Sequence, residues 1–510
     1  MKFVTVLLYH KSWLLEPTRM LMLLRILIFM IVIMGIGAHT DDAFRQAQPT
    51  ERPFQPVNLP TATPAPQVCP ELENPYPQHT VVADINYLAH TVWVQQRIRY
   101  ANTTGESLTQ LVFNIEANRW QNVFFLNRVA DNFDDLLYTL NNKRLVVDLM
   151  DPLPPNCVTN ILLEFQIQVP LIGLEVYSPK GYLGYTDRQM NLGHWLPTVA
   201  PYQNGEWVTR PPVLVGEQEI LEIADWVVML NLVEPPPNLV VAAPGQITQI
   251  SPTSWRYEHH ASREFSLSLS DQFVLHQAED EHGVQVEVYC FNTPELQPAG
   301  EHALDVATQS LSVYSDLFGQ YPYERLVVVQ GDFPDGMEFS GIVYVGDAWF
   351  TRWDGTPTSY LTLITAHEVS HQWWYARVGN DAAFHPWLDE ALATYSEYVY
   401  LEEYYPDLRD WWWAFRVDVY EPEGAVNSTV YEFSSAREYI NAVYLRGVRM
   451  LHELRQDLGT QAFFQLLADY AFNQADRIAS PDDFWHNFTP EQLELTAVTR
   501  SRYLRPETNN

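Results

Sequence analysis

The stretch ITAHEVSHQWWYARVGNDAAFHPWLDEALATYSEY, residues 364–398, carries the most informative pattern in this chain. Residues 367–371 within it read His-Glu-Val-Ser-His. On a helix, positions i and i+4 share one face, so the imidazoles of His367 and His371 can reach the same metal ion. Glu368 lies beside the first histidine and can hold the water molecule that such an ion polarises. The pattern indicates a catalytic metal site, although a helix with two ordinary histidines would have the same sequence.

A third ligand has to come from further along the chain. A histidine-rich continuation of the motif would need Gly at 374 and His at 377, but these positions hold Trp374 and Arg377. The alternative is a glutamate on the next helix, and WLDEALATYSEY supplies Glu390 near its start. Two histidines and one carboxylate leave one coordination position open, which is typical of catalytic zinc. His385 competes as a ligand, but its Phe-His-Pro-Trp turn favours a local structural role.

The residues around this stretch predict an α/β domain that becomes helical toward its end. A helix that stops at Gly319 is predicted from apolar residues at helical spacing, namely Leu304, Ala307, Leu311, Tyr314 and Phe318. The runs RLVVVQ and GIVYV predict two compact buried strands. Further helices are expected at residues 359–377, 389–403, 437–457, 460–473 and 481–488. We assign residues 279–500 to this catalytic domain.

The preceding part of the chain, residues 79–278, has a different character. Runs such as VVADINYLAHTVWVQQRIRYAN and SLTQLVFNIEAN alternate apolar and polar residues, and turn signals such as NTTGE separate them. Alternation with a period of two and frequent turns predicts an antiparallel β-sandwich. We find no catalytic cluster in this region.

The N-terminal residues 1–40 have the order of an export signal. Basic residues precede an uninterrupted apolar run at 26–36, and the small Gly37 and Ala38 follow it. Cleavage near Ala38 and retention as a membrane anchor both remain open. Residues 41–78 are rich in Pro and Thr and predict an extended linker. We assign residues 501–510 to a tail.

Composition narrows the function classes further. The chain has 510 residues, of which 47% are apolar, so it can fill large cores. Its 63 acidic and 30 basic residues give a formal charge of −33, which repels nucleic acid and excludes it as a partner. Three scattered cysteines exclude a cysteine-rich zinc site, and Cys290 is expected on the buried face of a strand. A Cys69–Cys157 bridge is possible in an exported protein.

Several motifs together resemble one enzyme family. HEVSHQWW followed by WLDEALATY is similar to the zinc motif of the membrane alanyl aminopeptidase family, a gluzincin family that includes leukotriene-A4-hydrolase-like enzymes. FGQYPYERLVVVQGDFPDGMEFSGIVYV resembles the approach to its exopeptidase motif, and VYLRGVRML resembles the segment with its catalytic tyrosine. The resemblance implies an α+β multidomain protein, in which a thermolysin-like α/β-to-α zinc peptidase domain follows the N-terminal β-sandwich.

The resemblance also implies roles for individual residues. One zinc ion per chain would be held by His367, His371 and Glu390, with Glu368 as the general base. The phenol of Tyr444 would stabilise the oxyanion. Contacts with the substrate are implied for Gly336, Met337, Glu338 and Tyr439, among which Glu338 would bind the free α-amine. Glu397 and Asp389 could orient the ligand histidines or be surface acids.

Some positions depart from the family pattern. Phe339 follows the exopeptidase glutamate where Asn is common, and Ala391 follows Glu390 where Gly is usual. Few residues follow the tyrosine segment, which leads us to expect a more open active site. We expect an exported, extracellular or membrane-tethered zinc aminopeptidase that acts on peptides. The alternatives are a peptidase with endo- or dipeptidyl action on the same scaffold and a non-catalytic, membrane-tethered binding module.

Overall fold

The computed structural model describes residues 69, 72, 74–173, 181–213, 215–334 and 336–506. The predicted export signal and nearly all of the 41–78 linker lie outside these residues. Among the helices that are described, none is long and apolar enough to cross a membrane. The described residues fall within one compact unit.

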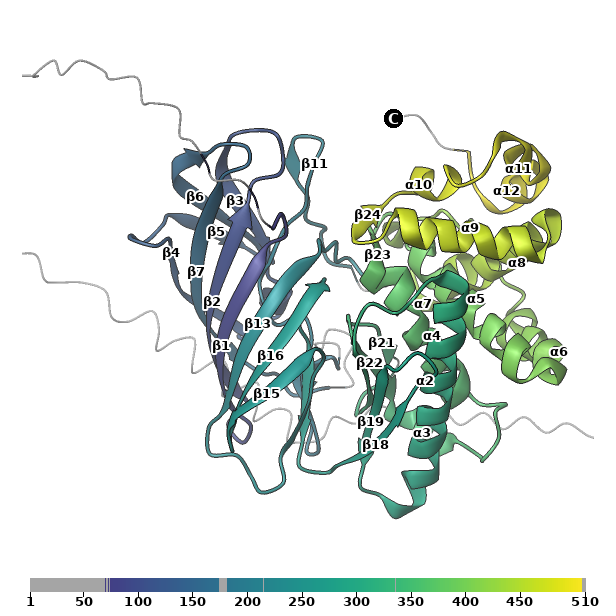
Figure 1. Ribbon diagram of the computed structural model, residues 1–510, viewed down its shortest axis with the longest axis horizontal. Helices are drawn as coiled ribbons and strands as arrows, with labels where there is room; N and C mark the ends of the chain where they lie inside the picture. The colour runs from purple at the N-terminus through teal and green to yellow at the C-terminus, as the bar shows by residue number, and fades with distance from the viewer. Residues whose placement is uncertain are drawn as a thin grey trace, which may run out of the picture. The chain divides into compact units, whose positions relative to one another are not determined.

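A seven-stranded sheet dominates the first half of this unit (Figure 1). Its strands, in spatial order, are β15 (Gln246–Ser251), β16 (Ser254–Ser262), β13 (Ala224–Leu232), β1 (Gln78–Asn86), β2 (Thr91–Ala101), β7 (Val158–Gln168) and β4 (Phe124–Ala130). Every other residue of β1 is buried, as the period-two pattern predicts. All neighbours are antiparallel except β1 and β13, which pair in parallel. This parallel pair brings together strands that are distant in sequence, so local alternation could not reveal it.

Two four-stranded sheets and a small hairpin complete the β domain. One sheet contains β10 (Thr198–Val199), β3 (Leu108–Asn114), β6 (Arg144–Leu153) and β5 (Tyr138–Asn141). The other contains β14 (Val240–Ala242), β17 (Leu267–Ser270), β9 (Met190–Leu192) and β8 (Leu183–Tyr185), and the hairpin joins β11 (Tyr202–Gln203) to β12 (Glu206–Trp207). Their apolar faces share one core with the seven-stranded sheet, including Trp195 and Trp226. The predicted β-sandwich is confirmed.

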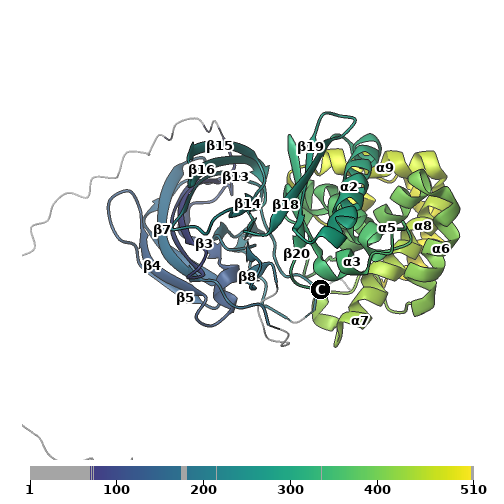
Figure 2. The same ribbon diagram turned by 90° about the horizontal axis from the view of Figure 1, so that it is seen from below.

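A five-stranded sheet supports the second half of the unit. Its order is β18 (Phe273–Glu279), β19 (Gln285–Phe291), β20 (Arg325–Gly331), β22 (Ile342–Gly346) and β21 (Gly336–Met337). The sheet thus begins inside the range that the sequence assigned to the first domain. Strands β19, β20 and β22 run parallel, and α2 (Gln297–Phe318) connects β19 with β20 and covers the sheet (Figure 2). Helix α2 ends at Gly319, whose φ of 103° suits glycine.

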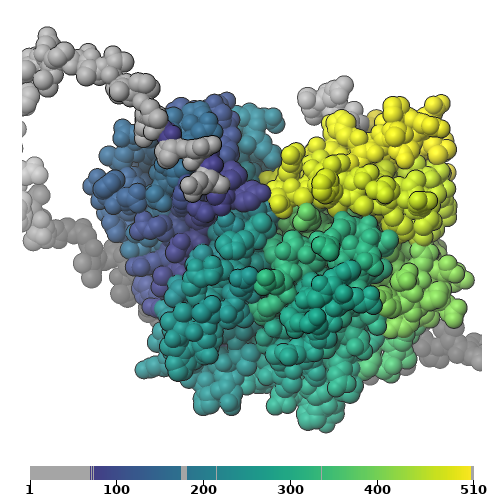
Figure 3. All heavy atoms as spheres, viewed as in Figure 1, coloured from purple at the N-terminus to yellow at the C-terminus, as the bar shows by residue number. Residues whose placement is uncertain are grey.

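Helices build the rest of the second half. The α-helices are α3 (Asp347–Arg352), α4 (Tyr360–Ser370), α5 (Trp387–Tyr404), α6 (Arg409–Trp412), α7 (Ala436–Tyr439), α8 (Arg446–Leu458), α9 (Thr460–Asn473), α10 (Pro481–Trp485), α11 (Pro490–Leu495) and α12 (Ala497–Tyr503). Short 3-10 turns lie at Glu116–Arg119, Pro294–Leu296, Pro406–Leu408, Asp418–Tyr420 and Val430–Glu432, and β23 (Val378–Asn380) pairs with β24 (Arg477–Ala479). The C-terminal helices, yellow in Figure 3, pack on the preceding ones through α8 and α9. Helix α12 runs into the range assigned to a tail because Tyr503 is buried and its hydroxyl donates to Glu453.

Two predicted helices are interrupted by π-helical segments. The helix expected at 359–377 is α4 followed by the π segment Gln372–Arg377, which kinks at Trp374. The indole of Trp374 donates to the Ser396 hydroxyl, so tertiary packing sustains the kink. The helix expected at 437–457 is α7, the π segment Ile440–Leu445 and α8. Such bulges are frequent at functional sites because they reorient a few side chains within a helix.

Arg263, which follows β16, ties the β domain to the second half of the unit. Its side chain is buried and donates to four backbone carbonyls, those of Leu221, Tyr375, Arg377 and Arg477. Gly379 leaves room for this guanidinium, since a Cβ there would overlap it. One side chain thus satisfies polar groups from segments far apart in sequence.

Candidate metal centre

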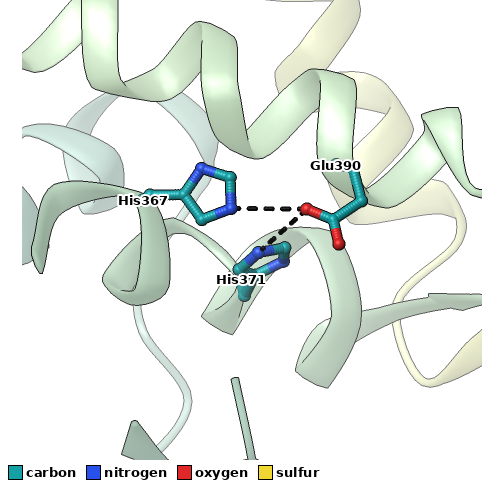
Figure 4. Close-up of side chains that lie close together, drawn as sticks. All are labelled: His367, His371 and Glu390. Atoms are coloured by element: carbon teal, nitrogen blue, oxygen red, sulfur yellow. Dashed lines mark ion pairs between the residues drawn. The ribbon is translucent and has the colours of Figure 1, made fainter. Parts of the chain in front are cut away.

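Three predicted ligands converge between α4 and α5. His367 lies on α4, His371 forms its C-cap, and Glu390 lies in the first turn of α5. Glu390 Oε2 lies 3.3 Å from His367 Nε2 and 3.7 Å from His371 Nε2 (Figure 4). All three side chains are buried, and their ligand atoms lie within 4.8 Å of one another. His385, the competing ligand, does not belong to this group of described residues.

The donor set fits zinc. Glu390 Oε2 is buried yet accepts no hydrogen bond from any residue that the structure describes. The Nδ1 atoms of His367 and His371 face other carboxylates, which leaves both Nε2 atoms directed at Glu390. Two imidazole nitrogens and one carboxylate oxygen around a shared point are a donor set typical of catalytic zinc. A buried carboxylate without a hydrogen-bond donor is costly unless a cation neutralises it.

Each ligand histidine contacts a second buried carboxylate. His367 Nδ1 lies 3.0 Å from Glu397 Oε1, and His371 Nδ1 lies 2.6 Å from Asp389 Oδ1. Arg416 donates to both oxygens of Glu397 at 2.8 Å. Burial alone would raise the pKa of Glu397, but Arg416 brings that pKa below its ordinary value. Glu397 and Asp389 are therefore buried partners of the ligands, and the surface-acid alternative is wrong for both.

Glu368 lies beside the ligands in a position suited to a base. Its Oε2 atom is buried and has no hydrogen-bond partner among the described residues. Burial raises the pKa of Glu368 to about 7, although His367 and His371 act in the opposite direction. Its carboxylate lies so close to Gly336 that a Cβ on that residue would overlap it. The side chain can therefore exchange a proton near neutral pH.

The two predicted tyrosines face the ligands from the α7–α8 region. The ring of Tyr444 stacks parallel to His367 with centroids 6.1 Å apart, and the ring of Tyr439 lies edge-on to Tyr444 at 5.4 Å. Burial and the Glu390 carboxylate raise the pKa of Tyr444 well above its usual value. Tyr444 therefore stays a neutral phenol that can donate a hydrogen bond.

The Gly336-Met337-Glu338 segment divides between the cavity and the core. Gly336 and Glu338 line the cavity that contains the ligands, whereas Met337 is buried in the β-domain core and does not line it. Successive side chains of an extended chain point to opposite faces, which explains the division. Phe339 is likewise buried, and its ring packs edge-on against His194 and Tyr182. Burial raises the pKa of Glu338 well above its usual value, and Glu217 adds to this effect.

The sequence analysis missed several residues of the cavity. The cavity has a volume of about 440 Å³ and is also lined by Glu217, Trp349, Tyr360, Arg416, Tyr420 and Arg437. These residues come from the segment before β13 and from the α3–α7 region. They follow no motif or helical spacing in the sequence, so only long-range packing identifies them.

A second cluster of potential metal ligands differs from the first because one of its carboxylates already has a cationic partner. The ligand atoms of His194, Glu217 and Glu219 also lie within 4.8 Å of one another. Glu219 is already paired with the buried Lys143, whose ammonium lies 3.2 Å from Glu219 Oε1 and 3.0 Å from Glu116 Oε2. Lys143 thus provides Glu219 with a cationic partner, whereas His194 Nε2 is buried without a hydrogen-bond partner among the described residues.

Comparison with known proteins gives consistent matches. Residues 302–501 match the model described as the peptidase family M1 domain. Aminopeptidase M1 of Arabidopsis thaliana is 28% identical over 218 residues, which is 40% of this chain and 25% of that protein. Endoplasmic reticulum aminopeptidase 1 of Homo sapiens is 28% identical over 219 residues, 40% of this chain and 23% of that protein. The chain thus spans about a quarter of the length of these relatives.

Solved structures match over a longer part of the chain. The M1 zinc metallopeptidase of Deinococcus radiodurans superposes with a TM-score of 0.59 at 17% identity, over 85% of this chain and 95% of that one. A mutant of it bound to a Tyr-Ser-Ala substrate gives a TM-score of 0.60 at 18% identity, over 85% and 96%. A two-domain M1 zinc metallopeptidase mutant bound to L-arginine gives 0.62 at 17% identity, over the same shares. These matches confirm the predicted fold, a β domain followed by a domain of mixed strands and helices.

Proposed function

We propose that this chain, whose residues 302–501 form a peptidase family M1 domain, is a zinc aminopeptidase that removes N-terminal residues from peptides. The observation that carries the proposal is the convergence of two imidazoles on the buried Oε2 atom of Glu390, beside the buried Glu368. The matched relatives are named aminopeptidases, and one matched structure holds a tripeptide.

The residues around the ligands have complementary roles in hydrolysis. His367, His371 and Glu390 would hold the zinc ion, which would supply the Lewis acidity that makes a water molecule nucleophilic near neutral pH. Glu368 accepts a proton from that water and transfers it to the nitrogen of the leaving amine. The phenol of Tyr444 donates a hydrogen bond to the carbonyl oxygen as negative charge develops on it.

Glu338 supplies the preference for a free N-terminus. It lies in the cavity with Glu217, Glu368 and Glu390, which are its main electrostatic neighbours. An ammonium group among these carboxylates neutralises charges that would otherwise repel one another in a buried space. A peptide with a protonated α-amine therefore binds more tightly than the same peptide with an acetylated one.

The first test separates the base from the ligands. Glu368→Gln keeps the volume of the side chain but cannot accept the proton, so we expect hydrolysis to fall by about 10²–10⁴-fold. Zinc content, measured by elemental analysis, should stay near one ion per chain because Glu368 is not a ligand. Glu402→Gln on the same helix as Glu390 serves as a control, since Glu402 pairs with Arg455 away from the ligands. Loss of zinc together with activity in Glu368→Gln would show that its role is misassigned.

The second test addresses exopeptidase action. Glu338→Ala should raise KM for free-amine peptides far more than for their N-acetylated forms. Equal effects on both peptides would favour the alternative of endo- or dipeptidyl action. That alternative depended partly on Phe339, which lies in the core and does not line the cavity. A protein with no bound zinc and no chelator-sensitive cleavage would instead be a non-catalytic module.

Export is a separate part of the proposal. The apolar run at residues 26–36 supports it, and so does a disulfide between Cys69 and Cys157, whose Cα atoms are 5.1 Å apart. Disulfides form and persist mainly in oxidising compartments outside the cytosol. N-terminal sequencing of the protein recovered from exported and membrane fractions distinguishes cleavage near Ala38 from a retained anchor. Recovery only from the cytosol, with free thiols at both cysteines, would contradict export.

A further inference from the structure

The charged residues that line the cavity fall into two groups. Glu338 and Glu217 lie with the other acids, and the residue beside Glu217, Gly216, packs against Tyr439. The cations are Arg416 and Arg437, which come from the π segment Trp413–Val417 and from α7. The cavity is therefore lined both by several acids and by two arginines.

Aromatic side chains that line the cavity lie beside Arg437. The Tyr360 and Tyr420 hydroxyl oxygens are 3.3 Å apart, and the ring of Tyr360 packs against Trp349 with centroids 4.8 Å apart. The Arg437 guanidinium lies over the ring of Tyr420, 4.3 Å from its centroid. None of these contacts involves Glu338.

Arg416 is already neutralised by a protein carboxylate. Its Nε atom donates to Glu397 Oε2 and one terminal nitrogen donates to Glu397 Oε1, both at 2.8 Å. The side chain is only 10% exposed. It acts on His367 through Glu397 and has little capacity left to bind a substrate anion.

Arg437 differs from Arg416 in its exposure and in its lack of an ion pair among the described residues. Its side chain is exposed, and it forms no ion pair with any carboxylate in the part of the chain that the structure describes. Stacking on Tyr420 fixes the plane of the guanidinium and leaves its N–H edge available for two hydrogen bonds to a carboxylate. In a chain with a net charge of −33 and an acidic cavity, a ligand carboxylate needs such a cation to approach.

The size of the cavity limits the ligand. Its volume of about 440 Å³ lies within the range of roughly 300–1,000 Å³ that is usual for small-molecule sites. A di- or tripeptide has a positive amine and a negative carboxylate a few bonds apart. Such a molecule matches a cavity that is lined by acids and by an arginine without an ion-pair partner among the described residues.

We infer that Arg437 binds a carboxylate of the substrate, so that the cavity selects short peptides with an amine at one end and a carboxylate beyond the scissile bond. This inference rests on the proposed aminopeptidase function. The carboxylate is either the free C-terminus of a short peptide or the acidic side chain of a residue that follows the scissile bond. Both sources present the same group to Arg437.

The test compares kcat/KM for Ala-Ala, Ala-Ala-amide and Ala-Asp-amide. We expect the wild type to hydrolyse Ala-Ala about tenfold better than Ala-Ala-amide, mainly through a lower KM. Arg437→Gln should lose most of this preference, and Arg437→Lys, which keeps the charge but not the stacking, should retain part of it. Arg502→Gln is the control, because Arg502 pairs with Glu453 on the surface of α12. If Ala-Asp-amide is also hydrolysed better than Ala-Ala-amide, Arg437 accepts the carboxylate of an aspartate side chain as well as that of a free C-terminus.

Two results would overturn the inference: equal rates for Ala-Ala and its amide in the wild type, or an equal loss on both substrates in Arg437→Gln. Zinc-loaded Glu368→Gln provides a measurement that does not depend on turnover, because tighter calorimetric binding of Ala-Ala than of its amide supports the inference by itself. Equal binding of the two contradicts it. Absence of hydrolysis of every peptide by the zinc-loaded wild type contradicts the proposed function alone.

Discussion

At the scale of single residues, each ligand histidine divides its two nitrogens between different carboxylates. His367 directs Nδ1 to Glu397 and Nε2 to Glu390, and His371 directs Nδ1 to Asp389. A carboxylate at Nδ1 holds the imidazole in the tautomer that presents a lone pair at Nε2. We therefore expect the affinity of the site for zinc to depend on residues that would not touch the ion.

Asp389→Asn tests this dependence. The amide oxygen can still accept from His371 Nδ1, but the negative charge is lost, so we expect zinc affinity to fall about 10–100-fold. Competition with a chelating dye measures the affinity without any assay of activity. Glu402→Gln, on the same helix, should bind zinc like the wild type. Unchanged affinity in Asp389→Asn would show that the contact with His371 does not influence the metal.

A buried histidine far from the ligands links stability to pH. His79 is 2% exposed, stacks on Trp226 and accepts from the Gln96 amide, and burial lowers its pKa to about 3. The unfolded chain binds a proton below about pH 6.5 but the folded one does not. Above pH 6.5 neither state binds this proton, and the neutral His79 contributes its full stability to the fold. As pH falls from 6.5 toward 3, protonation of the unfolded chain progressively removes this contribution.

His79→Phe removes this titration and keeps an aromatic ring beside Trp226. Between pH 6 and pH 4 the free energy of unfolding of the wild type should fall more steeply than that of the variant, by up to about 1.4 kcal/mol per pH unit. Denaturant unfolding at a series of pH values measures both slopes. The unpaired Gln96 donor should add only a pH-independent offset, so parallel curves would contradict the prediction.

At the scale of elements, glycines let neighbouring elements approach closely at the candidate site. Ala391 on α5 contacts Gly447 on α8 so closely that a Cβ on Gly447 would overlap it. This contact explains why a small residue follows Glu390 even though it is not glycine. Strand β21 approaches α4 in the same way, with Gly336 against the Glu368 carboxylate.

Gly336→Ala tests the approach of β21 to α4. The added methyl group displaces the Glu368 carboxylate, so we expect kcat to fall by about 10²–10⁴-fold while zinc content stays unchanged. Gly355→Ala is the matched control, because a Cβ there meets no neighbour and only the positive φ of 87° is strained. It should cost about 1 kcal/mol of stability and leave kcat unaltered. A fully active Gly336→Ala enzyme would contradict the proposed position of the base.

At the scale of the whole molecule, Arg263 joins segments from both halves of the compact unit. Its guanidinium donates to carbonyls that are otherwise buried between β16, the π segment after α4 and β24. Burial lowers the pKa of Arg263, but its ordinary value is so high that it stays charged.

Arg263→Met should therefore be strongly destabilising. The variant removes a donor from four buried carbonyls, of which only that of Arg377 is known to keep another donor, the Asp476 amide, and we expect a loss of about 3–5 kcal/mol in the free energy of unfolding. Thermal unfolding followed by circular dichroism measures the loss. Arg128→Met is the control, since Arg128 forms an exposed pair with Asp135 and should leave stability almost unchanged. Similar midpoints for both variants would show that the halves are held together in another way.

How much of the fold could be predicted from the sequence depends on how far apart in the chain the interacting residues are. The histidine pair, the stop of α2 at Gly319 and the alternation in β1 follow from spacings within one element. The parallel pairing of β1 with β13 and the π-helical kink at Trp374 depend on partners elsewhere in the chain.

The same distinction applies to the site. The sequence by itself determined the helical metal motif and, through the family resemblance, Glu390, Tyr444 and Glu338 as its candidate partners. Only the tertiary structure placed Met337 in the core, added Glu217 and Arg437 to the cavity and connected Arg416 to His367 through Glu397. The physical reason is that periodicity within an element encodes which face is buried, whereas contacts between distant segments are decided by how all the elements pack together.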